Sequence, residues 1–279
     1  MSGHFFCYNN KFYPENTSVI TSGNRSLRYG DGLFETMKVI DGKIINGSYH
    51  FERLFKGLSL LQFEIPKNFT LEFLQNKIQR LLEKNNHLKT ARVRVMLFRS
   101  DGGLFDPENF SPNYIIESWA MSENQQLNEN GLVTDVFPDA RKSCDMFSNL
   151  KTNNYLPYIM AAFFAKNNKL NDCIVLNTFG RICDSVISNI FIIRGEKIYT
   201  PPLSEGCIAG IMRRWMIEKL TLKPYNVVEK ELEINDLLDA DEIFLTNSIS
   251  HFRWVKTFRD RNYTNTVVKE IYKSFAQTI

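Results

Sequence analysis

The spacing of apolar and polar residues predicts strands that alternate with helices in the first part of the chain. Residues 34–40 alternate and stop at Asp41-Gly42, a hairpin turn signal before a returning strand at 43–45. Residues 49–61 and 71–82 carry apolar side chains at helical spacing, and Thr70 precedes the second of these helices as a capping residue. Two further strands are predicted at residues 90–98 and 113–119.

The second part of the chain continues this pattern after a polar stretch. Residues 121–131 are rich in Glu, Asn and Gln and are predicted to be a linker between domains 1–120 and 132–279. Because the strands come in runs that look antiparallel, with helices between them, an α+β fold is favoured over a parallel array. The elements predicted after the linker are strands at 132–137, 173–177, 189–193, 225–232 and 242–246 and helices at 154–167, 209–219 and 267–276.

Composition narrows the class of protein. Apolar residues make up 43% of the 279 residues and charged residues 23%, which is ordinary for a globular protein. A net charge of +3 without a block of like charges gives no indication of a nucleic-acid or membrane partner. The five scattered cysteines form no C-x-x-C pair, so neither a zinc site nor a disulfide framework is indicated. With no signal peptide and no long apolar run visible, we expect a cytoplasmic protein.

One lysine and one carboxylate carry the first chemical hypothesis. Lys151 lies among small and amide residues before an apolar helix, and Asp184 follows 33 residues later, before the strand Ser188-Asn189-Ile190-Phe191. If the two side chains meet in one pocket, they suit pyridoxal 5'-phosphate (PLP). An amine can bind the PLP aldehyde as a Schiff base, and an acid can keep the ring nitrogen protonated. Read alone, Lys151 is a typical solvated lysine and Asp184 a typical turn residue.

Three segments predict a site for a phosphate group. Arg53 lies on an amphipathic helix, and a guanidinium matches the geometry of a phosphate. Gly210-Ile211-Met212 begins a helix, where backbone N–H groups attract anions. Ser248 follows a strand and offers a hydroxyl. Each segment also fits an ordinary helix or turn, so the prediction depends on the three meeting.

These segments occur in the order found in the class IV, or fold-type IV, PLP-dependent aminotransferases, and the chain resembles that family from about Gly30 to Val255. The family includes branched-chain and D-amino acid aminotransferases and 4-amino-4-deoxychorismate lyases. The matching pieces are Gly30-Asp31-Gly32-Leu33-Phe34-Glu35, His50-Phe51-Glu52-Arg53-Leu54, Leu150-Lys151, Ser188-Asn189-Ile190-Phe191, Thr200-Pro201-Pro202-Leu203, Gly210-Ile211-Met212-Arg213 and Asp241-Glu242-Ile243-Phe244.

The resemblance implies a small N-terminal α/β sandwich, a larger C-terminal pseudo-barrel domain that binds PLP, and a homodimer with shared active sites. It also implies that Lys151 is the Schiff-base lysine and proton shuttle. Arg53, the amides of Ile211 and Met212, and Ser248 correspond to the residues that bind the phosphate, and Tyr155 to a tyrosine near the phenolic oxygen of the ring. Asp184 stands where the family normally has glutamate, which is a departure from its pattern.

Two reactions remain open. The D-amino acid enzymes hold the substrate carboxylate with a tyrosine and an Arg-x-His pair; here Phe34 takes the tyrosine position, and the stretch that begins Phe98-Arg99 has no such pair. An arginine shortly before a Gly-Gly pair, here Arg99 before Gly102-Gly103, looks more like the pattern of the lyases. We therefore expect an amino acid aminotransferase, with a lyase that releases pyruvate and 4-aminobenzoate as the alternative. A protein that binds PLP without turnover is a third reading, supported only by Asp184.

Overall fold

The computed structural model describes residues 4–122, 126–220 and 224–276, and the chain forms two compact units. The first unit contains the chain up to residue 124 together with Leu150–Asn154, and the second contains residues 125–149 and 155–279. The predicted division placed residues 150–154 with the second part, whereas the structure places them with the first. Residues 123–125 of the predicted linker lie outside the described part of the chain.

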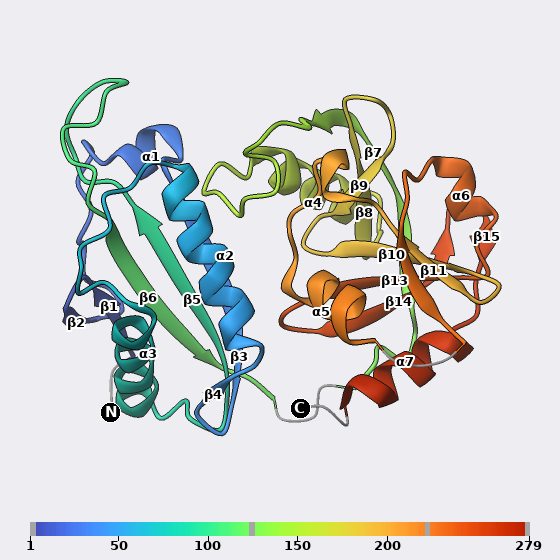
Figure 1. Cartoon of the computed structure of the whole chain (residues 1–279), viewed down its shortest axis with the longest axis horizontal. Coiled ribbons are helices and arrows are strands. Elements are labelled where there is room, and N and C mark those ends of the chain that lie inside the picture. Colours follow the sequence, from blue (N-terminus) through green and yellow to red (C-terminus); the bar gives the residue numbers. More distant parts are fainter. Residues whose placement is uncertain (1–3, 123–125, 221–223, 277–279) are drawn as a thin grey trace. The chain divides into compact units, whose positions relative to one another are not determined.

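The first unit is an antiparallel sheet covered by helices. Its strand order is β2 (Lys11–Pro14), β1 (Phe5–Tyr8), β6 (Asn113–Ala120), β5 (Thr90–Phe98), β3 (Gly32–Ile40) and β4 (Lys43–Ile44). The helices α2 (Gly47–Leu60) and α3 (Leu71–Asn85) pack on one face of this sheet, and α1 (Arg25–Tyr29) precedes β3 (Figure 1). The core lies between the sheet and the two long helices, where side chains such as Met37, Leu54 and Leu74 are buried.

Local sequence signals explain several of these elements. Asp41 and Gly42 both have positive φ angles, as a tight hairpin turn between β3 and β4 requires. The side chain of Thr70 accepts a hydrogen bond of 3.1 Å from the Phe73 amide, so the predicted N-cap of α3 is confirmed. β5 has the predicted bounds and an alternating burial pattern.

The second unit is built on one large curled sheet. Its order is β12 (Asn226–Glu229), β11 (Lys197–Thr200), β10 (Asn189–Arg194), β13 (Glu242–Asn247), β14 (His251–Phe258), β7 (Leu132–Lys142), β8 (Asp172–Asn177) and β9 (Ile182–Ser185), with β15 (Arg261–Asn262) paired to β14. Three pairs are parallel, namely β11–β12, β14–β7 and β7–β8, and the others are antiparallel. The predicted pseudo-barrel of an α+β fold is confirmed.

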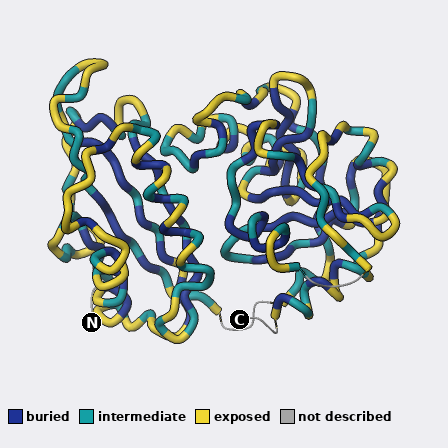
Figure 2. Tube along the Cα trace, viewed as in Figure 1, coloured by how far each residue is buried: buried dark blue, intermediate teal, exposed yellow. Residues whose placement is uncertain are grey.

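Helices cover this second sheet, and its strands β8, β9, β10 and β13 are almost entirely buried (Figure 2). The helix α4 (Leu156–Asn167) packs on β7 and β8, and α5 (Ile211–Lys219) packs on β12 and β13. α7 (Thr266–Ala276) also contacts β13, while α6 (Ile234–Leu238) and the short 3-10 helix Leu203–Glu205 complete the unit. No helix among the described residues is long and apolar enough to cross a membrane.

Candidate active site

Lys151 is held against the first unit by backbone hydrogen bonds. Its carbonyl accepts a 2.8 Å bond from the Phe34 amide, and the Asn153 amide donates to the Gly32 carbonyl over 2.9 Å. Thr152 forms an antiparallel bridge with Leu33. The segment therefore behaves as a short extra strand along the start of β3. This placement fixes the backbone of Lys151 beside the glycine-rich segment that the sequence singled out.

The ring of Phe34 lies between two cations. Lys151 Nζ and the guanidinium carbon of Arg94 are each 4.5 Å from the ring centroid. Cations near an aromatic face are attracted to its negative charge density. Burial lowers the pKa of Arg94, and its Nε is buried with no hydrogen-bond partner among the described residues. Lys38 points to the same face of the sheet as Phe34, because strand side chains repeat every second residue. This face therefore combines an amine with buried positive charge.

Arg53 is paired with a buried carboxylate on β3. Its Nε and Nη2 donate to the two oxygens of Glu35 over 2.7 Å each, and His50 Nδ1 lies 2.6 Å from Glu35 Oε2. Burial alone raises the pKa of Glu35, but Arg53 and His50 outweigh it and hold that pKa at about 2. Glu35 thus fixes one edge of the Arg53 guanidinium, and the predicted phosphate contact of Arg53 stays a prediction.

Arg99 has contacts that hold the first unit together. Its guanidinium donates to Asp31 and to the Leu61 carbonyl, and it lies 4.2 Å from the ring centroid of Phe63. The residue is only 7% exposed. These contacts favour a structural role for Arg99 over the substrate contact that the sequence suggested.

Asp184 lies inside β9 and is the centre of a buried polar cluster in the second unit. Its Oδ2 accepts from Lys142 Nζ at 3.1 Å, from the Tyr158 hydroxyl at 2.7 Å and from the Ile208 amide at 2.9 Å. Its Oδ1 accepts from Asn189 Nδ2 at 2.9 Å. All four partners donate, and the Cys183 thiol lies 3.8 Å from Oδ2 as a weaker fifth donor, so both oxygens of Asp184 act as acceptors. Asp184 is therefore no simple turn residue.

Asn189 connects Asp184 to the predicted phosphate-binding segment. Its side-chain amide also donates to the Ile208 carbonyl over 2.8 Å. Gly210 follows as the N-cap of α5, and a Cβ there would meet Asn189 Oδ1 at 1.8 Å, so only glycine allows this close approach. Because Gly210 has no side chain, no N-cap side chain occupies the first-turn amides of Ile211 and Met212. The phosphate contact of the Ile211 and Met212 amides stays a prediction.

The Ser248 turn and Tyr155 are each linked to this cluster through a neighbouring residue. Ser248 belongs to the turn after β13, in which Asn247 accepts from the Ile249 and Ser250 amides and donates to Ser188 over 3.1 Å. The turn is thereby tied to the start of β10. The Tyr155 ring stacks on Tyr158 with centroids 4.4 Å apart, which links it to the Asp184 cluster.

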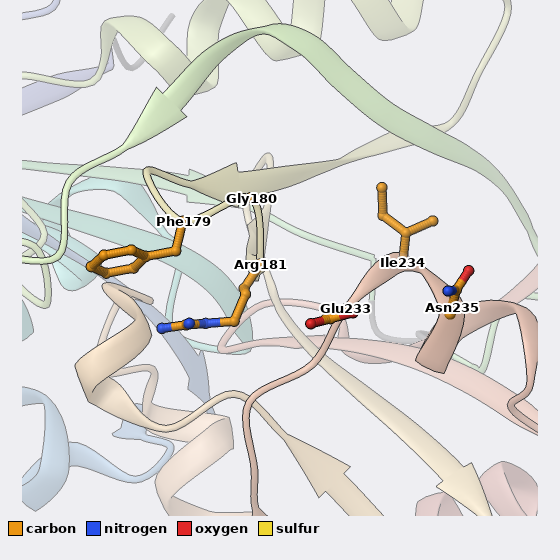
Figure 3. A pocket seen from close by; sticks show the side chains of 6 residues that line it. All are labelled: Phe179, Gly180, Arg181, Glu233, Ile234 and Asn235. Atoms are coloured by element: carbon orange, nitrogen blue, oxygen red, sulfur yellow. The ribbon is translucent and has the colours of Figure 1, made fainter.

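A separate pocket of about 310 Å³ lies at the turn between β8 and β9 (Figure 3). It is lined by Phe179, Gly180, Arg181, Glu233, Ile234 and Asn235. Arg181 pairs there with Glu205 at 2.5 Å and 2.7 Å. None of the residues predicted to bind cofactor or substrate lines this pocket, so it adds nothing to the candidate site.

The predicted site residues thus fall into two groups, each described within its own unit. Phe34, Arg53, Arg99 and Lys151 belong to the first unit, and Phe34 and Lys151 are in contact. Tyr155, Asp184, Ile211, Met212 and Ser248 belong to the second. The meeting of Lys151 with Asp184 stays a prediction. The residues of these contacts that were not predicted from the sequence are Glu35, Arg94, Lys142, Tyr158 and Asn189. Of these, only Glu35 and Asn189 lie in segments that match the family motifs, which is the one signal that could have found them.

Comparisons with known proteins show which family the chain resembles over most of its length. The family model for class IV amino-transferases matches residues 32–258. A Methanocaldococcus jannaschii protein, provisionally named branched-chain-amino-acid aminotransferase, is 28% identical over 96% of this chain and 93% of its own length. The aminodeoxychorismate lyase of Bacillus subtilis is also 28% identical, over 86% of this chain and 82% of its own.

A solved structure shows the same fold. The branched-chain aminotransferase of the thermophilic archaeon Thermoproteus uzoniensis, solved with norvaline, superimposes with a TM-score of 0.88 over 98% of this chain and 93% of its own, at 22% identity. The chain therefore belongs to the class IV aminotransferase family, whose members are in general PLP-dependent enzymes; another structural neighbour is complexed with N-(5'-phosphopyridoxyl)-L-glutamate. Within that family the chain has both aminotransferase and aminodeoxychorismate lyase relatives, which confirms the predicted family and leaves both reactions compatible.

Proposed function

We propose that this chain is a PLP-dependent amino acid aminotransferase and that Lys151 is the lysine that binds the cofactor. The observation that carries the proposal is the contact of Lys151 with Phe34, beside the half-buried guanidinium of Arg94. The amine of Lys151 then lies next to the positive charge of Arg94, and this charge can bind a substrate carboxylate. Arg94 suits this task because a guanidinium matches a carboxylate with two parallel hydrogen bonds.

The residues of the second unit fit the cofactor. Asp184 Oδ1 accepts from Asn189, the one donor to this oxygen among the described residues, and an sp² oxygen has room for a second. The start of α5 lies three residues beyond Ile208, which is bonded to both Asp184 and Asn189, so a ring-nitrogen acceptor and a phosphate site are tied together. When bound, PLP supplies an electron sink for charge that develops at the substrate Cα.

Each residue then has a defined task. Lys151 Nζ moves a proton between the substrate Cα and the cofactor C4'. Asp184 Oδ1 accepts a hydrogen bond from the ring nitrogen. The Ile211 and Met212 amides, Arg53 and Ser248 hold the phosphate, and Tyr155 lies near the phenolic oxygen. Arg94 orients the substrate carboxylate across the Phe34 ring.

The lyase is the second candidate. It is favoured by a relative named aminodeoxychorismate lyase, which is 28% identical to this chain, as the first aminotransferase relative is, but over 86% rather than 96% of it. The lyase shares the lysine and the ring contact and differs only after the proton has left Cα, when pyruvate is eliminated. Contacts on the substrate side decide between the two reactions.

The proposal includes a cytoplasmic homodimer. All five cysteines are free, which is typical of a reducing compartment. Along α4 the side chains of Leu156, Ile159, Met160 and Phe163 are 45–62% exposed and form one apolar stripe at helical spacing. A second copy of the chain is the partner we propose for this stripe, and light scattering on the purified protein measures the mass that decides it.

One experiment tests the central proposal. The purified protein, loaded with PLP, is reduced with borohydride, digested and mapped by mass spectrometry, and the pyridoxyl label should lie on Lys151. A label on another lysine overturns the assignment. A parallel sample is mixed with L- and D-amino acids and with aminodeoxychorismate. A change in the cofactor spectrum with formation of a keto acid supports the aminotransferase, and release of pyruvate with an aromatic amine supports the lyase.

A further inference from the structure

Lys142 is an unusual lysine, because it is almost fully buried at the end of β7. The residue is 9% exposed, and its partner Asp184 is 2% exposed. Its Nζ lies 3.1 Å from Asp184 Oδ2 and 5.2 Å from the ring centroid of Tyr158. A buried ammonium is costly unless it is paired and well coordinated. Its position beside the proposed ring-nitrogen acceptor therefore calls for a functional explanation.

The two oxygens of Asp184 are used unequally. Oδ2 accepts from Lys142, from the Tyr158 hydroxyl and from the Ile208 amide, all within 3.1 Å. A carboxylate oxygen has two lone pairs, and Cys183 Sγ lies 3.8 Å from Oδ2 as a fourth, weaker donor, so this oxygen is already crowded. Oδ1 accepts from Asn189 alone among the described residues. A further donor must therefore come to Oδ1.

Charge gives Lys142 a second effect. Lys142 and Asp184 together are neutral, so a protonated ring nitrogen beside Asp184 meets a carboxylate whose charge is already shared with an ammonium. The positive charge of an ammonium disfavours a second positive charge nearby, here that of the protonated ring nitrogen. Lys142 thus lowers the affinity of the ring nitrogen for its proton. At the same time it fixes the position of the Asp184 carboxylate that contacts this nitrogen.

We propose that Lys142 is a positioning residue that occupies Oδ2 of Asp184, leaves Oδ1 for the ring nitrogen of the cofactor, and tunes how firmly that nitrogen keeps its proton. The inference depends on the proposed function, because it presumes that PLP binds beside Asp184. It assigns to Lys142 no contact with substrate or cofactor.

The groups around the pair permit a clean titration. The other titratable and charged residues near Lys142 and Asp184 are Tyr155, Tyr158, Cys144, Cys183, Cys207, Arg213 and Glu229. Burial, followed by the charge of Asp184, raises the pKa of Tyr158 and of Cys183 well above their ordinary values. Burial also raises the pKa of Cys207 to about 12. These three buried groups keep their protons over the neutral and mildly alkaline range.

The test compares Lys142→Met and Lys142→Gln with Lys142→Arg, and uses Lys166→Met as the matched control. Lys166 is an exposed lysine on α4 of the same unit. Each holoenzyme is loaded with PLP labelled with ¹⁵N in the ring, and the nitrogen chemical shift is followed from about pH 6 to about pH 10. The neutral variants should keep the ring nitrogen protonated to a pH higher by about one unit or more. Lys142→Arg and Lys166→Met should follow the wild type.

Each outcome decides the question. Profiles of Lys142→Met and Lys142→Gln that coincide with the wild type, including profiles that do not change with pH, overturn the proposal. So does a pair of neutral variants that fail to fold or to bind PLP while Lys142→Arg succeeds, because the lysine then serves only the fold. If the wild type itself binds no PLP on Lys151, the proposed function fails first, and the borohydride map shows which of the two has failed.

Discussion

Replacing Glu35 with glutamine should change how the stability of the protein depends on pH. Glu35 is 1% exposed and bonded to both Arg53 and His50. Its pKa falls from the ordinary value of 4.5 to about 2 on folding. A shift of that size corresponds to about 3 kcal/mol of stability at neutral pH.

The sign follows from the direction of the shift. Because the folded pKa is depressed, the stabilisation is complete above the unfolded value of 4.5 and is lost as the pH falls toward about 2. Between about pH 5.5 and about pH 3.5, Glu35 alone should cost the wild type about 1.4 kcal/mol. Burial lowers the pKa of His50, and Glu35 only partly offsets that effect, so His50 adds a loss of its own on acidification in both proteins.

The assay is urea unfolding followed by circular dichroism at both pH values. Glu35→Gln should be less stable than the wild type at about pH 5.5 by about 3 kcal/mol, and the gap should shrink by about 1.4 kcal/mol at about pH 3.5. Glu64→Gln removes an exposed carboxylate from the same unit and is the matched control, expected to follow the wild type. A gap between Glu35→Gln and the wild type that stays constant with pH would falsify the reasoning, because Glu35 would then not titrate between the two states.

Two further substitutions test the proposed site. Asp184→Asn should keep PLP bound but slow proton removal from Cα by orders of magnitude in stopped-flow spectra. Asp184→Glu should lower activity if the cluster is packed around the shorter acid. An unchanged rate in both variants would leave Asp184 without a role. Arg94→Met should raise KM for the amino acid by about tenfold or more, the loss of a charge-assisted contact of roughly 1.5–3 kcal/mol, with little change in PLP affinity. An unchanged KM in that variant would remove Arg94 from the substrate site.

Local sequence signals were enough for much of the fold. The turn at Asp41-Gly42, the cap at Thr70 and the alternation of β5 each depend on residues close together in the chain, and each is confirmed. The strand β9 escaped prediction, because Ile182–Ser185 is too short for its alternation to be read. Asp184 precedes the strand β10, as predicted, but it also lies within the unpredicted β9.

The candidate site was harder to predict, since its contacts join distant parts of the chain. The sequence does not single out Lys142, because lysines are mostly exposed. Only the fold shows that β7 ends beside Asp184. The pairing of Lys151 with Phe34 joins residues far apart in the sequence and is a matter of backbone hydrogen bonds, which leave no mark on side-chain patterns. The resemblance to a family indicated which residues mattered and gave no account of their neighbours.

The short strand that carries Lys151 has a consequence for cutting the protein into pieces. The chain leaves the second unit after Asn149, supplies five residues to the first, and returns at Tyr155. A fragment of residues 126–279 would thus contain Lys151 but lack the Phe34 amide to which its carbonyl is bonded. A fragment that ends before residue 123 would expose the edge of β3 that Leu150–Asn154 covers. Neither unit is formed by one continuous stretch of the chain, so a single cut between them divides a unit as well.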